Sequence, residues 1–237
     1  MLYLIGMGLG SEKDITINGL EAVKSCDKVF LECYTSKLVD VDVKKLEEFY
    51  GKKIILADRD LVENNPGEIL NSAKKGNAAL LIVGSPLGAT THMDILQRAK
   101  KLNIDVNVID NAGILTAVGI TGLSLYKFGR VVTIPKDNKN VISPYDFMLK
   151  NKEIGLHTLV LLDINEELMS AREGLDYLIR CGMDIKEKVI VCGGLGGENP
   201  EIKYGEAGDV SVSKFPQCVI LLGELHFAEE EFLNNYL

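Results

Sequence analysis

Short apolar runs alternate with segments of helical spacing over the first 110 residues, and no other feature constrains the fold of this chain as strongly. The apolar runs have the length of β-strands, and the run at 78–83, AALLIV, is apolar at every position. A strand of that kind is buried on both faces, as in the middle of a parallel sheet. The pattern therefore predicts an α/β fold whose sheet has five mostly parallel strands and helices on both faces. The predicted strands are 2–5, 28–33, 53–56, 78–83 and 106–109.

The segments between these runs predict four helices, at 15–24, 41–50, 66–75 and 91–102. Thr16 is placed to cap the first of them, because a threonine side chain there can accept a backbone N–H. Gly51 follows the second, where a glycine commonly ends a helix in the left-handed conformation.

The regular alternation of predicted strands and helices ends near Asp110. This change divides the chain into two predicted domains, 1–110 and 111–237. The connections between apolar runs are short in the second half, which favours hairpins and a mixed sheet in a second α/β domain. Helices are predicted at 112–125 and 166–180, and strands at 131–134, 157–162, 188–192, 210–212 and 218–222.

Charge and cysteine content exclude several classes of protein. The chain carries 34 acidic and 26 basic residues, a formal net charge of −8, and no long basic run, which disfavours nucleic-acid binding. No apolar run approaches the roughly 20 residues that cross a bilayer, and the first run lacks the basic leader of a signal peptide. The cysteines are odd in number and scattered, which argues for reduced thiols in the cytoplasm and against a zinc site or a disulfide framework. They are Cys26, Cys33, Cys181, Cys192 and Cys218.

Glycine-rich or polar loops follow most of the predicted strands. In open parallel sheets ligands bind beyond the carboxyl ends of the strands, and glycine lets a ligand approach the backbone closely. Any one of these loops is equally well explained as a tight turn. Their shared position at strand ends favours a nucleotide-like pocket. The loops are 6–10, 84–92, 110–114 and 193–197, together with Asp163 after the strand at 157–162.

The strongest rival interpretation is a dinucleotide-binding oxidoreductase. Gly6 and Gly8 follow the first strand, and Glu32 ends the second, where an acidic group would hold a ribose. The fingerprint requires a third glycine or an alanine where this chain has Ser11. The helix also begins late, after residues 12–14, so a pyrophosphate would not rest on its N-terminus. The rival is therefore disfavoured.

Several stretches, in order along essentially the whole chain, together resemble the diphthine synthase family. That family belongs to the tetrapyrrole-methylase-like class of S-adenosylmethionine methyltransferases. The opening MLYLIGMGLGSEKDIT, GSPLGATTH at 84–92 and GLSLYKFG at 122–129 are similar to the corresponding family segments. NAGI, SPYDF, HTLVLLDI and the terminal LHFAEEEFL fit in the same order. ATTH, LYKFG and the HTLVLLDI stretch, in this order and spacing, distinguish the family from other members of the class.

The resemblance implies two α/β domains with the cofactor in the cleft between them, usually in a homodimer. The implied cofactor is S-adenosylmethionine, with S-adenosylhomocysteine as product and no metal. The implied acceptor is translation elongation factor 2, on which a modified histidine carries a 3-amino-3-carboxypropyl group. Members of the family methylate that amine during diphthamide biosynthesis. We expect no direct nucleic-acid binding and no membrane association.

Carried over position by position, the resemblance implies two groups of cofactor contacts. They are Leu9, Ser85, Gly88, Gly113 and Ile114 in the first group, and Leu162, Leu195 and Gln217 in the second. Three of these positions depart from the family, which normally has aspartate at Ser85, serine at Gly113 and histidine near Gln217. Ser85 can donate or accept a hydrogen bond but brings no charge. Loss of the carboxylate would weaken cofactor binding or shift it to backbone contacts.

A sulfonium methyl group is already electrophilic, so its transfer needs in-line positioning of a neutral amine more than a strong catalytic group. The substrate-side candidates are Tyr34, Thr35, Thr90, Thr91 and Tyr126. His92 is the candidate base, because an unperturbed imidazole titrates near neutrality. An equally good interpretation is that His92 orients its loop, so the catalytic residue stays open. Lys127 and Arg130 are candidates for binding the carboxylate of the acceptor, with a solvated surface position as the alternative.

Two other functions stay open. One is methylation of a tetrapyrrole by the same fold, and the other is a non-catalytic cofactor-binding protein, which the change at Ser85 motivates. The number of methyl groups added is open as well. The GATTH and EFYGKK stretches look more like the eukaryotic branch of the family, which favours a methyl ester product over the trimethylated amine alone.

Overall fold

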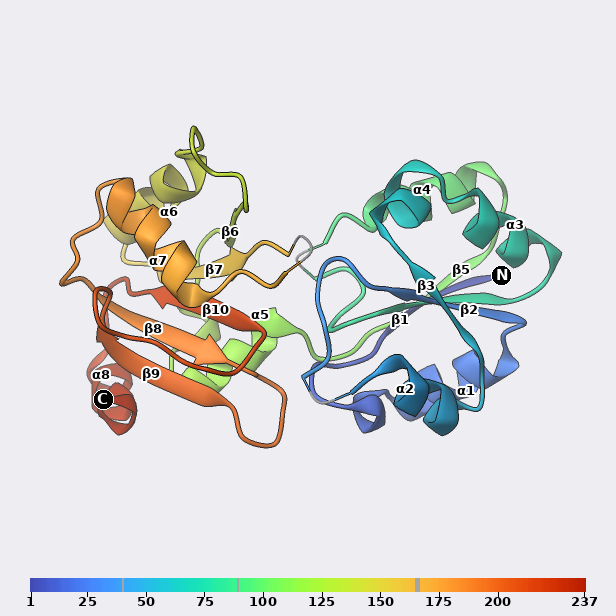
Figure 1. Cartoon of the computed structure of the whole chain (residues 1–237), viewed down its shortest axis with the longest axis horizontal. Helices are drawn as coiled ribbons and strands as arrows, with labels where there is room; N and C mark the ends of the chain where they lie inside the picture. The colour runs from blue at the N-terminus through green and yellow to red at the C-terminus, as the bar shows by residue number, and fades with distance from the viewer. Residues whose placement is uncertain (40, 89, 165–166) are drawn as a thin grey trace. The chain divides into compact units, whose positions relative to one another are not determined.

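The computed structural model describes residues 1–39, 41–88, 90–164 and 167–237, and Figure 1 shows its ribbon. The chain divides into two compact units, Met1–Leu115 and Thr116–Leu237. The sequence pattern predicts the boundary after residue 110. The division into compact units falls after Leu115, inside the short helix α5 (Ile114–Ala117).

The first unit contains a sheet of five strands that are all parallel, as the sequence pattern predicts. Its strands are β1 (Leu2–Gly6), β2 (Lys28–Glu32), β3 (Ile54–Ala57), β4 (Ala78–Ile82) and β5 (Val106–Ile109). Their order across the sheet is β3-β2-β4-β1-β5. Strand β4 is thus inserted between β1 and β2, so that β1 and β4 are neighbours in the middle of the sheet.

Helices cover both faces of this sheet (Figure 1). Helices α1 (Ile17–Ser25) and α2 (Val43–Tyr50) pack on one face, and α3 (Gly67–Lys75) and α4 (Met93–Lys101) pack on the other. Successive side chains of a strand point to opposite faces. Leu80 therefore packs with α3 and α4, while Leu81 packs with α1 and α2. Full burial of one such leucine contributes roughly 2 kcal/mol.

The ends of the first two helices follow the sequence signals. The Thr16 side chain accepts a hydrogen bond from the Gly19 N–H, and Gly51 ends α2 in the left-handed conformation at φ 67°. A separate turn of 3-10 helix, Glu12–Asp14, lies between β1 and α1 and is capped by Ser11. The first long helix therefore does begin late, and the 3-10 turn separates it in the chain from the loop at 6–10.

The second unit contains a mixed sheet, as predicted. Its strands are β6 (Val132–Ile134), β7 (Thr158–Leu162), β8 (Lys188–Gly193), β9 (Glu201–Glu206) and β10 (Gln217–Leu221). Their order is β6-β7-β10-β8-β9, in which β6 and β7 are parallel and the other neighbours are antiparallel. Helices α6 (Ser143–Glu153) and α7 (Ala171–Arg180) cover one face, while α8 (Phe227–Leu233) lies on the other (Figure 1).

Several predictions for the second half are wrong in detail. The expected strand at 210–212 is a loop, where Val210 is apolar because it packs into the core beside the sheet. The paired strand is instead β9, whose charged sequence EIKYGE is typical of a sheet edge. The helix expected at 166–180 begins at Ala171, where Ser170 and Glu173 form a capping box; its expected first residue, Glu166, lies outside the described residues.

The helix expected at 112–125 is broken into shorter pieces. Helix α5 continues into a 3-10 turn, Val118–Thr121, which ends at Gly122 with φ 85°. A second 3-10 turn, Leu125–Lys127, follows. Helices α6 and α8 are not predicted at all, although the SPYDF and LHFAEEEFL stretches lie in them. In the described part of the chain, no helix has the length and apolar character needed to span a bilayer.

Candidate functional site

The loops that follow β1 and β4 meet at the carboxyl edge of the first sheet. Gly8 and Gly84 form a bridge between them, in which the Gly84 N–H donates to the Gly8 carbonyl oxygen at 2.8 Å. Both glycines have a positive φ, 75° and 80°, which other residues rarely adopt. The chain leaves β1 toward α1 and β4 toward α4, on opposite faces of the sheet. This is the switch point at which open α/β sheets bind ligands.

The loop after β5 packs against the same place. A Cβ added to Gly84 would lie 3.4 Å from the Gly113 Cα and 3.5 Å from a methyl carbon of Leu9. A Cβ added to Gly113 would lie 3.2 Å from the Ser85 Cβ, and one added to Gly88 would lie 3.3 Å from it. The structure thus gathers the first group of predicted cofactor positions, Leu9, Ser85, Gly88 and Gly113, with Ile114 next in the chain at the start of α5.

This group of residues fits an adenosyl group. Ser85 offers a hydroxyl, the glycines expose backbone amides and carbonyls, and Leu9 and Ile114 offer apolar side chains to a base. Ser85 and Gly113 are two of the positions at which the chain departs from the family it resembles. Because Ser85 and Gly113 are in contact, the two differences from the family change the same part of the candidate site.

Asn111 braces the loops around this place. Its Nδ2 donates to the Gly6 carbonyl at 3.0 Å and to the Asp14 carbonyl at 2.9 Å, and its Oδ1 accepts from the Ala112 N–H at 2.8 Å. The Asp14 carboxylate in turn accepts from the Gly10 N–H at 2.8 Å. One asparagine therefore joins the loop after β5 to the loop after β1.

The second group of predicted cofactor positions lies at one edge of the second sheet. Leu162 ends β7, and Gln217 begins the adjacent antiparallel strand β10, directly opposite Gly193 at the end of β8. Leu195 follows in the loop after β8 and is buried. The Gln217 side chain is engaged within the protein, since it accepts from the Ala171 N–H at 2.7 Å and donates to the Val212 carbonyl at 3.1 Å. It therefore braces the loop before β10 against the start of α7.

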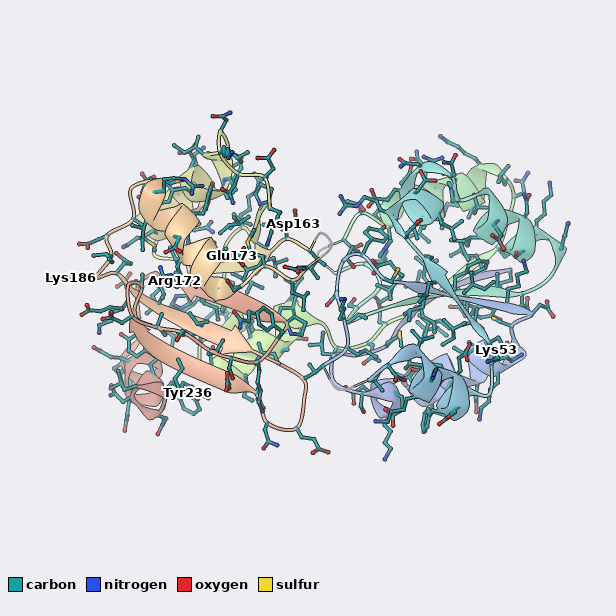
Figure 2. The ribbon with its side chains drawn as sticks, in the orientation of Figure 1. Lys53, Asp163, Arg172, Glu173, Lys186 and Tyr236 are labelled. Atoms are coloured by element: carbon teal, nitrogen blue, oxygen red, sulfur yellow. The ribbon has the colours of Figure 1, made fainter. Side chains whose placement is uncertain are left out.

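Lys136 connects two acidic residues at this edge. Figure 2 shows Asp163 beyond β7 and Glu173 on α7. The Asp163 carboxylate accepts from the Lys136 N–H at 3.0 Å, and Glu173 accepts from the Lys136 Nζ at 2.9 Å. Hydrogen bonds from Ser170 and then from Lys136 lower the pKa of Glu173 to about 2. Asp163, which follows the strand in the sequence motif, thus holds the segment that follows β6.

Four of the substrate-side candidates lie in the first unit, and two glutamates hold three of them, Tyr34, Thr35 and Thr91. The buried Glu32 carboxylate accepts from the Tyr34 N–H at 2.9 Å, the Thr35 N–H at 2.6 Å and the Thr35 hydroxyl at 2.6 Å. This glutamate therefore shapes the loop after β2, and three of its acceptor sites are engaged within the protein. The observed role of Glu32 is thus to hold the Tyr34–Thr35 segment.

The second glutamate, Glu63, joins this loop to the loop after β4. Its Oε1 accepts from the Tyr34 hydroxyl at 3.2 Å and from the Thr91 hydroxyl at 2.8 Å. The Arg59 guanidinium lies over the Tyr34 ring, 5.3 Å from its centroid. Burial, followed by the charges of Glu63 and Glu32, raises the pKa of Tyr34. The phenol therefore stays protonated and acts as a hydrogen-bond donor.

His92 lies beneath this loop and is 2% exposed. Its Nδ1 is 3.2 Å from the Pro86 carbonyl oxygen and 2.7 Å from the Thr90 hydroxyl. A carbonyl can only accept, so Nδ1 carries the proton and Nε2 is the bare nitrogen. Burial lowers the pKa of His92, and the nearby carboxylates offset this only in part. This geometry supports the interpretation in which His92 orients its loop, in preference to a base that reaches the substrate.

The remaining candidates, Tyr126 and its neighbour Lys127, belong to the second unit. Tyr126 is 87% exposed on the turn Leu125–Lys127. The Lys127 Nζ donates to the buried Glu229 carboxylate and to the Glu224 carbonyl. Lys127 is therefore neither a solvated cation nor free to bind an acceptor carboxylate. Arg130 stacks on Phe147, with the guanidinium carbon 3.4 Å from the ring centroid.

Glu229 brings together three motifs of the second half. Besides Lys127, it accepts from the backbone N–H groups of Ser124 and His226, both at 2.8 Å, and lies 3.6 Å from His157 Nε2. Burial raises its pKa, but these donors outweigh burial, and the pKa of Glu229 falls to about 2. The LYKFG, HTLVLL and LHFAEEEFL stretches thus share one buried ionic cluster, which fixes the turn that presents Tyr126.

Neither Glu63 nor Glu229 stands out in the sequence as a functional residue. Glu63 lies in a π-helical turn, Asp60–Asn64, just before the turn signal Asn-Asn-Pro, where an acidic residue is ordinary. Glu229 is one of three consecutive glutamates near the end of the chain. Its inclusion in a motif was the one signal that could have singled it out.

Comparison with known proteins gives one consistent result. The family model of the tetrapyrrole (corrin/porphyrin) methylases matches residues 1–211. Diphthine methyl ester synthase of Schizosaccharomyces pombe is 41% identical over 267 aligned residues, which cover all of this chain and 94% of that protein. A crystal structure of diphthine synthase matches with a TM-score of 0.93 at 32% identity, covering 99% of this chain and 95% of that one.

A relative of greater identity matches over a shorter region. Diphthine methyl ester synthase of Candida glabrata is 55% identical over 166 residues, which cover 69% of this chain and 56% of that protein. The match with this relative therefore spans a little over half of its length.

Proposed function

The chain belongs to the tetrapyrrole (corrin/porphyrin) methylase family, in its diphthine synthase group, and we propose that it methylates a modified histidine of translation elongation factor 2. It is an S-adenosylmethionine-dependent methyltransferase of diphthamide biosynthesis. The acceptor is the amine of the 3-amino-3-carboxypropyl group that this histidine carries. The observation that supports this function most directly is the meeting of the 6–10, 84–92 and 110–114 loops at the switch point between β1 and β4.

The proposed cofactor contacts are the two groups of residues at the sheet edges. Leu9, Ser85, Gly88, Gly113 and Ile114 form the first group, and Leu162, Leu195 and Gln217 form the second. In the first group the Ser85 hydroxyl and the glycine backbone would hold polar atoms of the adenosyl group, while the two apolar side chains flank the base. When bound, S-adenosylmethionine supplies an electrophilic methyl group on a sulfonium and leaves as S-adenosylhomocysteine.

The protein contributes position to this reaction more than acid–base chemistry. The nitrogen lone pair of the acceptor forms the new bond to the methyl carbon, and the electron pair of the broken carbon–sulfur bond goes to sulfur. In-line alignment of the reacting atoms therefore decides the rate. Tyr34, Thr35, Thr90 and Thr91 are the proposed acceptor-side residues of the first unit, and Tyr126 is the proposed one of the second. His92 holds the 84–92 loop through Pro86. The proton that the amine loses passes to water.

The proposed product carries a methyl ester in addition to the trimethylated amine. In that last transfer a carboxylate oxygen of the same group would form the bond to the methyl carbon, and the electron pair of the carbon–sulfur bond would again go to sulfur. Two of the relatives compared above carry the name diphthine methyl ester synthase, and the GATTH and EFYGKK stretches support the same branch. We further propose that the protein is cytoplasmic, acts as a homodimer and binds neither nucleic acid nor membrane. The scattered cysteines support the cytoplasmic location, the net charge of −8 disfavours nucleic-acid binding, and the homodimer follows from the resemblance to the family.

The test is to incubate the purified protein and S-adenosylmethionine with elongation factor 2 that carries the aminocarboxypropyl-histidine intermediate. Intact-protein mass spectrometry then counts the methyl groups. A gain of four supports the ester-forming reaction, and a gain of three supports a trimethylating enzyme. No gain with intact S-adenosylmethionine binding in calorimetry would overturn the acceptor and revive the tetrapyrrole or non-catalytic alternatives. No gain and no binding would overturn the cofactor assignment.

A further inference from the structure

Glu63 occupies a place that neither the sequence motifs nor the family comparison assigns. It lies in the turn Asp60–Asn64, which follows β3. The strands β3, β2 and β4 are consecutive neighbours in the first sheet, and all are parallel. Their carboxyl ends therefore lie side by side, with Glu63 after β3, Tyr34 after β2 and Thr91 after β4.

A single oxygen of Glu63 joins the other two loops. Oε1 accepts from the Tyr34 hydroxyl at 3.2 Å and from the Thr91 hydroxyl at 2.8 Å. A charged acceptor makes hydrogen bonds that are stronger than those between neutral groups. Tyr34 and Thr91 are 57 positions apart in the sequence, and Glu63 Oε1 is an acceptor that their hydroxyls share. Glu63 therefore couples the loops after β2 and β4 in addition to the pairing of the two strands.

The backbone around Glu63 is itself held in place. The Arg98 guanidinium of α4 donates to the Glu63 carbonyl at 3.2 Å and pairs with Asp94 at 2.6 Å. The Asp60 carboxylate accepts from the side chains of Asn64 at 3.0 Å and Asn65 at 3.0 and 3.1 Å. The carboxylate of Glu63 is thus presented from a fixed turn.

Further contacts connect Thr91 with Ser85 in the proposed cofactor loop. Thr91 precedes His92, whose Nδ1 is within hydrogen-bond distance of Thr90 and of the Pro86 carbonyl. Pro86 directly follows Ser85, which packs against Gly113. A continuous series of contacts therefore leads from the Tyr34 loop, through Glu63 and the 90–92 segment, to Ser85.

We propose that Glu63 is a positioning residue. It holds the acceptor-side loops after β2 and β4 at fixed positions relative to each other and to the Ser85 loop. This inference rests on the proposed function. The same nitrogen must be aligned again for each N-methylation while it changes from a primary amine to a quaternary ammonium group. Each added methyl group restricts the approaches that lead to the next transfer. Loss of this relative positioning of the loops therefore slows the later transfers more than the first.

The experiment compares Glu63→Ala, which removes the acceptor oxygen, with Glu63→Gln, which keeps an oxygen that can accept both hydrogen bonds. Glu48→Ala, at an exposed position of α2, is the surface control. The readouts are the methyl count by intact mass, kcat and KM for elongation factor 2, and S-adenosylmethionine affinity by calorimetry. With Glu63→Ala we expect mono- and dimethylated products to accumulate and kcat/KM to fall about fivefold or more, since two hydrogen bonds to a charged group are lost. We expect cofactor affinity to stay within about twofold of the wild type, and Glu63→Gln to recover most of the activity.

An unchanged product distribution in Glu63→Ala would overturn the proposal. So would equal impairment of Glu63→Gln, which would mean that charge and not the shared acceptor matters. A parallel loss of cofactor affinity would mean a general structural role and would also overturn it. If Glu63→Ala does not fold, Tyr34→Phe and Thr91→Val remove the two hydrogen bonds singly. The proposal then requires partial product accumulation in each, and in the double variant an effect smaller than the sum of the two.

A measurement on the chain alone separates this inference from the proposed function. Amide hydrogen exchange in segments 33–37 and 90–93 should be faster in Glu63→Ala than in the wild type and unchanged in Glu48→Ala. If the wild type does not methylate elongation factor 2 but exchange rises as expected, the acceptor assignment fails and the role of Glu63 stands. If exchange does not change, the role of Glu63 fails, whatever the acceptor.

Discussion

Gly113 lies so close to Ser85 that a Cβ on Gly113 would come within 3.0 Å of the Ser85 backbone nitrogen and 3.2 Å of its Cβ. The loops after β4 and β5 thus meet backbone to backbone at the switch point of the first sheet. With serine at position 85, a side chain on Gly113 requires a shift of a few tenths of an ångström in Ser85, which is the residue proposed to hold a polar atom of the cofactor.

We therefore expect Gly113→Ala to weaken S-adenosylmethionine binding about tenfold, equivalent to about 1.4 kcal/mol, by shifting the Ser85 loop. Isothermal titration calorimetry measures this directly. Gly67→Ala is the matched control, because an added Cβ at Gly67 meets no atom within 4 Å. Equal affinity of Gly113→Ala and the wild type would show that the Ser85 loop does not contact the cofactor.

The buried carboxylate of Glu229 should stabilise the second unit measurably. In Glu229→Gln the Lys127 ammonium loses its charged partner, and we expect the free energy of unfolding to fall by about 2 kcal/mol. Chemical denaturation measures the loss. Glu230→Gln, at the exposed neighbouring position of the same helix, should change stability by less than about 0.5 kcal/mol.

The contribution of Glu229 should also depend on pH with a definite sign. Its pKa is lowered from 4.5 to about 2 in the folded protein, so the unfolded chain takes up the proton first as the pH falls. Its stabilising effect is therefore complete above about pH 5 and is lost between about pH 4.5 and pH 2. The difference in stability between the wild type and Glu229→Gln should shrink over that window. A difference that is the same at pH 6 and pH 3 would contradict the assignment.

His92 should make the protein less stable below neutrality. Burial lowers its pKa from 6.5 in the folded state, so the unfolded chain binds the additional proton. Stability then falls as the pH drops below about 6.5, with a slope of at most about 1.4 kcal/mol per pH unit for one proton. We expect urea denaturation between pH 7.5 and pH 5 to show a shallower decline for His92→Asn than for the wild type. Identical slopes would show that the imidazole is not held neutral by burial.

The thiols should fall into two reactivity classes. Cys26, Cys192 and Cys218 are buried, and Cys33 and Cys181 are partly exposed. Burial raises the pKa of Cys26 to about 11, and the adjacent Cys218 thiol together with burial raises that of Cys192 well above its ordinary value. Because the thiolate is the reactive form, we expect no more than two thiols to react with dithiobis(nitrobenzoic acid) in the native protein. All five should react in guanidinium chloride. Rapid reaction of more than two native thiols would contradict the packing of both sheets.

Local sequence signals were sufficient for the elements that carry the proposed cofactor loops. AALLIV at 78–83 is apolar on both faces, which only a covered central strand requires, and it forms β4 in the middle of the first sheet. Thr16 and Gly51 act through atoms within a few residues of themselves, so their capping roles are readable without the fold. The edge strand β9 was missed, because a half-solvated edge strand has no apolar run.

The contacts that organise the candidate site were decided by the tertiary structure. The sequence by itself determined that glycine loops follow parallel strands, and the family motifs added which loops are proposed to hold the cofactor. Only the order β3-β2-β4-β1-β5 placed the loops of β1 and β4 together, and only that order brought Glu63 between Tyr34 and Thr91. Strand order depends on pairing and packing between residues that are far apart in the chain. The hydrogen-bond partner of a side chain at a strand end is therefore set by which strands become neighbours, and no local pattern encodes it.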